Sequence, residues 1–108
     1  MKPSGFAVVI VTTSSRDEAD KIASVLLKKR KAACVNIVPG VKSHFWWKGK
    51  IDSSDEVLMV IKTKASVLAD VTETVRKNHS YTIPEIIALP IVSGDEDYLE
   101  WISREVRD

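Results

Sequence analysis

An imidazole, a phenol and a carboxylate lie close together in this chain as His79, Tyr81 and Glu85. Together these groups could bind a cation or another small ligand in a cleft between subunits. Alternatively, His79 ends a helix and interacts with the carbonyl groups there, while Glu85 pairs with a neighbouring cation. The residues alone favour this second, structural interpretation.

An enzyme active site would need a nucleophile with a base, a pair of carboxylates or a phosphate-binding loop. The sequence contains none of these at a recognised spacing, and its four glycines are isolated from one another. Cys34 is the only cysteine, which excludes an intrachain disulfide and a cysteine-based zinc site. At the start of a predicted strand, its thiol is expected to be packed rather than reactive. We therefore expect a protein that is not an enzyme.

Three consecutive aromatic residues, Phe45, Trp46 and Trp47, are followed by a Lys-Gly-Lys turn. Successive side chains of a strand point to opposite faces, so at least one face of this segment should contact another protein surface. Tryptophans could also stack on nucleic-acid bases. The net charge of +1, however, provides no long-range attraction to nucleic acid. We expect the three aromatics in a subunit interface, and His44 there or on the surface.

The composition is that of a single globular domain covering residues 1–108, with 44% hydrophobic and 29% charged residues. No apolar run approaches the ~20 residues of a membrane span, and residues 1–5 are too short and polar for a signal peptide. The basic run at residues 28–31 could bind nucleic acid, but it equally suits a helix C-terminus, which we prefer. These features predict a cytoplasmic protein without membrane or nucleic-acid partners.

Hydrophobic periodicity predicts the order β-α-β-β-α-β followed by a terminal helix. Nearly continuous apolar runs over residues 6–11 and 56–62 predict central strands that are buried on both faces. Prolines mark the other two strands, which begin at residue 34 and span residues 84–90, so we expect these at the sheet edges. The Pro39-Gly40 pair also predicts a bend or bulge.

Spacings of three and four residues predict the helices. The first begins at Ser15, and Glu18 is expected to reach back to that serine in a capping box. Its predicted buried stripe comprises Ala19, Ile22, Ala23, Leu26 and Leu27. The second helix begins near residue 67, and the third follows a cap at Ser93 or Asp95.

Two βαβ-type halves with right-handed crossovers give an α+β, ferredoxin-like fold with the strand order four-one-three-two. Both main helices then cover the same sheet face, although the central strands are apolar on both faces. A terminal helix of about a dozen residues is too small to cover the other face, so a symmetric homo-oligomer is expected. The aromatic hairpin should reach a neighbouring subunit.

Several motifs spread over nearly the whole chain are typical of one family. They are Ala33-Cys34-Val35-Asn36-Ile37, residues 43–51 (SHFWWKGKI), Ile61-Lys62-Thr63, His79-Ser80-Tyr81, Pro84-Glu85-Ile86, and Gly94 with Asp97, Tyr98, Leu99 and Trp101. In these the chain resembles the CutA proteins, the divalent-cation tolerance family. The resemblance implies a ferredoxin-like fold with an extended hairpin and a tight homotrimer similar to the PII-type signalling proteins. The family name describes a phenotype and not a reaction.

The resemblance also implies a metal-binding pair, His79 and Glu85, near the subunit junctions. Cu(II) is the expected metal, bound weakly unless further ligands join, and no tightly bound cofactor is expected. Many members have His-Pro-Tyr-Glu in this loop, where the present chain has Ser80 and Thr82. Some members carry a cysteine after the first strand, where this chain has threonine, so a copper site that uses that thiolate is not expected.

An alternative function follows from the similarity to PII-type trimers. A small-molecule sensor or scaffold would hold its ligand, such as a small anion, in the cleft between subunits. The candidate residues for that cleft are Lys48, Lys50, Lys62 and Tyr81.

Overall fold

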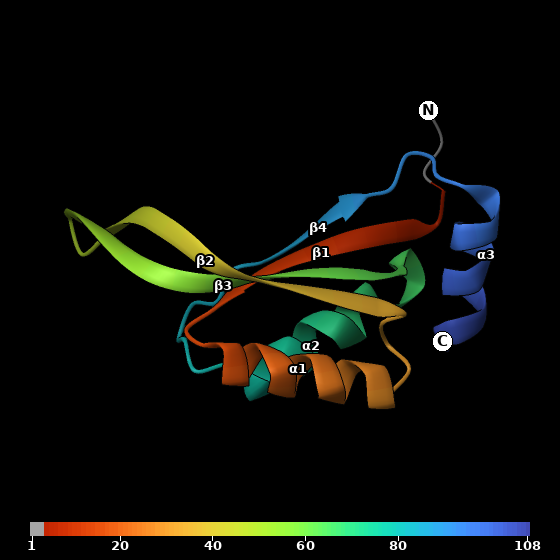
Figure 1. The fold of residues 1–108 in the computed structure, drawn as a ribbon, viewed down its shortest axis with the longest axis horizontal. Coiled ribbons are helices and arrows are strands. Elements are labelled where there is room, and N and C mark those ends of the chain that lie inside the picture. The colour runs from red at the N-terminus through yellow and green to blue at the C-terminus, as the bar shows by residue number, and fades with distance from the viewer. Residues whose placement is uncertain (1–3) are drawn as a thin grey trace.

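The structure is a computed structural model that describes residues 4–108, so the expectation about residues 1–5 lies partly outside the described residues. Its elements are β1 (Phe6–Thr13), α1 (Arg16–Lys28), β2 (Cys34–Trp47), β3 (Lys50–Lys64), a 3-10 turn η1 (Ala65–Val67), α2 (Leu68–Asn78), β4 (Ile86–Pro90) and α3 (Glu96–Glu105) (Figure 1). This order confirms the predicted β-α-β-β-α-β arrangement with a terminal helix.

The four strands form one antiparallel sheet in the order β2-β3-β1-β4. This is the predicted order, and it confirms β1 and β3 as central strands. Pro39 and Pro90 lie in the edge strands β2 and β4, where a missing N–H donor is tolerated. β4 begins at Ile86, two residues later than predicted, so Pro84 and Glu85 belong to the preceding loop.

Helices α1 and α2 lie on one face of the sheet, and α3 lies at the end opposite the hairpin (Figure 1). The core lies between that face and the helices. Val9 and Val11 of β1, Met59 of β3 and Ile22 and Leu26 of α1 are all at most 1% exposed. Leu27, which was predicted to be buried, is 42% exposed. It lies about 100° further around the helix than Leu26, at the end where the chain turns away.

The start of α1 corrects one detail of the predicted capping box. The Ser15 hydroxyl accepts the Glu18 N–H at 3.1 Å, as expected for an N-cap. The Glu18 carboxylate does not return to Ser15; it accepts the N–H groups of Ser14 at 3.1 Å and Ser80 at 2.8 Å. The loop after α2 brings in a second donor, and the carboxylate therefore links two segments.

Strands β2 and β3 form a long hairpin whose distal half extends beyond the helices (Figure 1). A β-bulge between Val38 and Val41 confirms the irregularity that Pro39-Gly40 predicted. β3 is longer than predicted, because residues 50–55 continue the ladder as partners of β2. The hairpin carries Trp46 and Ile51, which are 73% and 69% exposed.

The sheet face opposite the helices is apolar. Val8 pairs with Leu89 and Ile10 pairs with Ile87, and directly paired residues share a face. Ile87 and Leu89 are 52% and 49% exposed. Within the part of the chain that the structure describes, no helix covers these side chains (Figure 1).

The ion pairs of the basic run at residues 28–31 support a structural role for it at the end of α1. Arg30 pairs with Glu105 at 2.8 Å, and Lys31 pairs with Asp70 at 3.3 Å. Both cations follow the end of α1, where they join it to α3 and α2.

Candidate functional site

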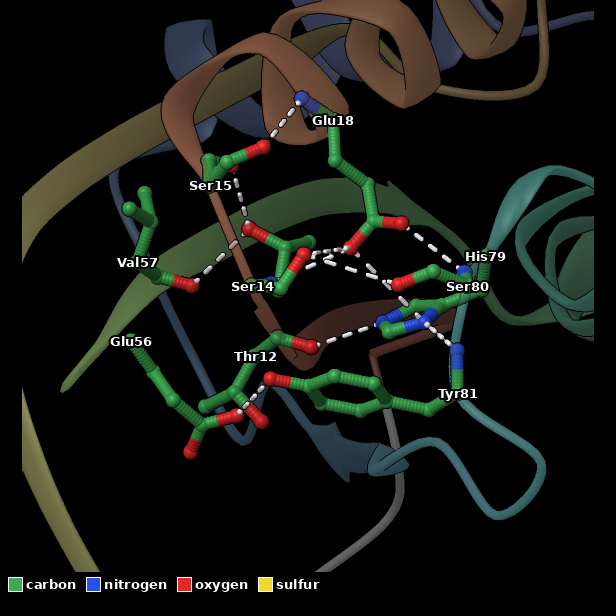
Figure 2. A network of polar contacts seen from close by, with 10 residues as sticks. Thr12, Ser14, Ser15, Glu18, Glu56, Val57, His79, Ser80 and Tyr81 are labelled. Atoms are coloured by element: carbon green, nitrogen blue, oxygen red, sulfur yellow. Dashed lines mark hydrogen bonds and ion pairs between the residues drawn. The ribbon is translucent and has the colours of Figure 1, made fainter. Parts of the chain in front are cut away.

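His79 caps the C-terminus of α2, and its side chain is fully enclosed. Its Nδ1 accepts the Tyr81 N–H at 3.1 Å, and its Nε2 lies 2.8 Å from the Thr12 carbonyl oxygen (Figure 2). Because Nδ1 accepts a hydrogen bond, the ring proton is on Nε2, and the Nε2–H group donates a hydrogen bond to the Thr12 carbonyl oxygen. The imidazole thus fixes the loop after α2 to the end of β1.

This geometry leaves His79 without a free ring nitrogen for a metal, because both nitrogens are engaged within the chain. Glu85 is not among its hydrogen-bonding or ionic partners. Among residues 4–108, no group of three or more His, Cys, Asp or Glu side chains could hold a metal ion. The His79 imidazole thus has a structural role here, and the metal-binding pair of His79 and Glu85 stays a prediction.

Glu18 holds the same loop from the other side. Desolvation opposes its ionisation, but the hydrogen bonds from Ser80 and Ser14 lower the pKa of its carboxyl below the usual value. Glu18 Oε1 lies 3.9 Å from His79 Nδ1. Figure 2 shows this network joining the start of α1 to the loop.

Tyr81 extends the network toward β3. Its hydroxyl donates to Glu56 Oε2 at 2.8 Å, and its ring packs on the His79 imidazole with ring centroids 4.7 Å apart. Burial, together with the hydrogen bond and the charge of Glu56, raises the pKa of Tyr81 to about 12. The phenol therefore remains a neutral hydrogen-bond donor at physiological pH.

A cleft of about 860 Å³ lies between the distal hairpin and the loop over residues 80–85. Its walls carry three carboxylates, from Asp52, Glu56 and Glu85. Its other functional side chains include those of His44, Phe45, Trp46, Trp47 and Tyr81. None of the described residues that line it is Lys or Arg. Its charge therefore suits a cation rather than an anion.

The predicted site residues fall into two groups. Tyr81, Glu85 and His44 line the cleft together with the three aromatics of the hairpin. Lys48 and Lys62 do not line it. The Lys48 ammonium lies 6.0 Å from the centroid of the Trp47 ring, and the Lys62 ammonium donates to Asn36. The expected anion site at these lysines is not formed in the single chain.

Sequence reasoning missed Asp52 and Glu56. The polar stretch over residues 52–55 resembled a loop, because it contains two aspartates and two serines. The signal was an alternation of period two, in which Asp52, Ser54 and Glu56 line the cleft while Ser53 and Asp55 do not. That alternation is typical of a strand with one functional face.

Known proteins similar to this chain agree with this architecture. A sequence model described as CutA1 divalent ion tolerance protein matches residues 7–105. A divalent-cation tolerance protein CutA from Archaeoglobus fulgidus is 46% identical over 98 residues, which cover 91% of this chain and 95% of the relative. The chloroplastic CutA of Arabidopsis thaliana is 46% identical over 101 residues, covering 94% of this chain and 56% of the relative. This chain therefore spans little more than half the length of that plant protein.

Solved structures of CutA proteins are also similar to this chain. The periplasmic divalent cation tolerance protein CutA from Archaeoglobus fulgidus has a TM-score of 0.92 at 44% identity, covering 94% of this chain and 99% of that one. CutA1 from Oryza sativa has a TM-score of 0.94 at 42% identity, covering 98% and 97%. None of the helices in the described part of the chain is long and apolar enough to cross a membrane. By its fold and its sequence, this chain belongs to the CutA1 divalent ion tolerance family.

Proposed function

We propose that this chain is a homotrimeric divalent-cation tolerance protein that binds metal weakly and catalyses no reaction. The observation that carries the proposal is a cleft with three carboxylates and, among its described lining residues, no Lys or Arg. Such a cleft attracts cations and disfavours anions. The names of relatives in Archaeoglobus fulgidus and Thermus thermophilus, divalent-cation tolerance protein CutA, support a role in the response to metal ions.

Glu85 is the proposed metal contact within the cleft, and Cu(II) is the preferred ion. Its carboxylate is exposed at the end of the loop, and His44 adds an imidazole to the same walls. Nitrogen and oxygen ligands suit Cu(II). Binding is expected to be weak, because no ready-made group of three ligands exists among residues 4–108. His79 contributes indirectly, by holding the loop that carries Glu85.

Calorimetric titration with Cu(II) tests this assignment. Replacing Glu85 by Gln should weaken Cu(II) binding about tenfold, because the substitution removes a charged ligand and keeps the shape of the side chain. Asp20→Asn is the matched control, since Asp20 is an exposed carboxylate on α1 outside the cleft. Equal affinities for the wild type and both variants would show that Glu85 is not a ligand.

The apolar open face supports the proposed trimer. Ile87, Leu89 and Val38 are each 44% exposed or more, so association through this face would remove substantial apolar surface from water. Trp46 at the hairpin is available to contact a neighbour. Native mass spectrometry checks the assembly, and a stable monomer at micromolar concentration would contradict it.

The compartment is part of the proposal. Cys34 is a free, partly buried thiol, which fits the reducing cytoplasm. The printed names of two relatives place those proteins elsewhere, in the chloroplast and in the periplasm. Localising a tagged form of the protein in its own cell tests this point, and a signal from another compartment would overturn it.

A further inference from the structure

The tip of the β2-β3 hairpin, residues 46–51, is apolar and basic. Trp46 pairs with Ile51 across the two strands, so both strongly exposed side chains lie on one face. The same six residues include Lys48 and Lys50 and no acidic residue. Among residues 4–108, no carboxylate forms an ion pair with either lysine. The hairpin tip therefore combines uncovered apolar surface with two positive charges.

Lys48 adopts an unfavourable backbone conformation at this turn. Its φ is 51°, and Gly49 follows with a φ of 77°. Where both central residues of a hairpin turn have positive φ, Asn or Gly suits the first position better than Lys. The Lys48 ammonium lies 6.0 Å from the centroid of the Trp47 ring, which is the outer limit of a cation–π contact. Because the turn itself does not favour a lysine, we expect its charge to have a role outside the hairpin.

The opposite end of the molecule has the complementary character. Three exposed apolar side chains lie around the start of α3, at 41–51% exposure; they are Leu89, Val92 and Tyr98. Three consecutive exposed acidic residues begin the helix: Asp95, Glu96 and Asp97. Asp95 accepts the Tyr98 N–H at 3.0 Å, so acidic and apolar residues adjoin. Among residues 4–108, no cation forms an ion pair with these carboxylates. We call these six residues the α3 patch.

The hairpin tip and the α3 patch cannot meet within one chain. They lie at opposite ends of a molecule whose longest extent is 44 Å (Figure 1). A contact between the tip of one copy and the α3 patch of another is therefore head-to-tail. Such contacts form a closed ring when the rotation between neighbours allows it, and a homotrimer is a ring of this kind.

We propose that the hairpin tip of each copy docks on the α3 patch of a second copy of this chain. Trp46 and Ile51 then cover the apolar side chains of the patch, and Lys48 and Lys50 face its carboxylates. Complementary charge at the rim of an apolar contact fixes which surfaces meet. Leu89 also belongs to the open sheet face, so this contact continues the interface proposed there. The inference rests on the proposed homotrimer and names two surfaces through which its subunits meet.

Charge reversal tests the contact on the full chain, with light scattering over a urea series at low salt as the measurement. One variant carries Lys48→Glu with Lys50→Glu, and a second carries Glu96→Lys with Asp97→Lys. Each places like charges opposite one another and should raise the dissociation constant of the trimer at least about tenfold. A third variant carries all four substitutions, which restores opposite charges across the contact. Its trimer should regain most of the lost stability.

Lys21→Glu with Lys29→Glu is the matched control, because both lysines are exposed on α1 and the net charge changes equally. This control should change the dissociation constant less than about twofold. Circular dichroism checks that the variants fold, since Glu96 and Asp97 lie in the first turn of α3. If the α3 variant does not fold, the hairpin variant compared with the control decides.

Lys48→Asn separates assembly from the stability of the turn. Asparagine accepts positive φ more readily than lysine, so the variant removes the charge without straining the hairpin. Its trimer should dissociate about threefold more readily, while the thermal stability of the subunit is unchanged or higher.

The inference and the proposed trimer fail separately. A wild-type protein that is monomeric at micromolar concentration would refute both. A trimeric wild type whose two charge-reversal variants dissociate no more readily than the control would refute the docking of the tip on the α3 patch and leave the trimer standing. Loss of the trimer in both variants without recovery in the fourfold variant would also refute this pairing of surfaces.

Discussion

The two halves of β3 differ in what surrounds them. Residues 57–64 pair with β1, and residues 58–62 also pair with β2. This half contributes Met59 and Ile61 to the core, where both are fully buried. Residues 50–55 pair with β2 and extend beyond the helices, and Ile51 in this half is 69% exposed. One continuous strand therefore serves two purposes. Its proximal half stabilises the subunit, and its distal half presents side chains for assembly and binding.

The largest expected effect is in the proximal half. Met59→Ala should lower the free energy of unfolding by about 2–5 kcal/mol, because it leaves a cavity between the sheet and the helices. Ile51→Ala, in the distal half of the same strand, should change the stability of the isolated subunit by less than about 0.5 kcal/mol. Urea denaturation measures both. Equal losses would show that the two halves of the strand do not differ in this way.

Assembly of the trimer should depend on exposed apolar residues more than on core residues. Ile87→Lys places a charge on the open apolar face, and we expect it to shift the trimer to monomers at micromolar concentration, because burying an unpaired charge is unfavourable. Light scattering coupled to size exclusion measures the shift. Ile83→Lys is the control, since Ile83 is also strongly exposed, at 73%, but lies in the loop. If both variants remain trimeric, the open face is not the interface.

The fold was predictable because its signals are local. Pro39 and Pro90 marked the edge strands, and the continuous apolar runs marked the central ones. The distal half of β3 was missed because a strand outside the core has no apolar pattern, so its polar residues resembled a loop. The role of His79 was not predictable in detail. Its imidazole is satisfied by Thr12, 67 positions away, and no local pattern encodes that contact.

Substitutions of the two histidines compare a buried side chain with an exposed one, and their expected effects on stability are smaller. His79→Phe keeps an aromatic ring of slightly larger size but leaves the Thr12 carbonyl and the Tyr81 N–H unpaired, which should cost about 1–3 kcal/mol of stability. His44→Phe changes an exposed residue of the hairpin and should cost less than about 0.5 kcal/mol. Thermal and urea unfolding compare them. Equal costs would show that the His79 hydrogen bonds do not stabilise the loop.

Glu18 should give the smallest effect and a distinct dependence on pH. Folding lowers the pKa of its carboxyl from the ordinary value of 4.5, so the folded state binds this proton less readily than the unfolded chain. The resulting stabilisation is present above pH 4.5 and is lost as the pH falls through the lower pKa of the folded state. Glu18→Gln should remove this contribution, costing up to about 1 kcal/mol near neutral pH and nothing at the acid end.

Asp17→Asn is the control for this measurement, because Asp17 lies in the same first turn of α1 and is exposed. Urea unfolding as a function of pH should give parallel curves for the wild type and Asp17→Asn. The Glu18→Gln curve should converge with that of the wild type as the pH falls. A constant offset between those two curves would mean that Glu18 stabilises the loop through its shape and neutral hydrogen bonds. In that case its charge does not link α1 to the loop that carries Tyr81 and Glu85.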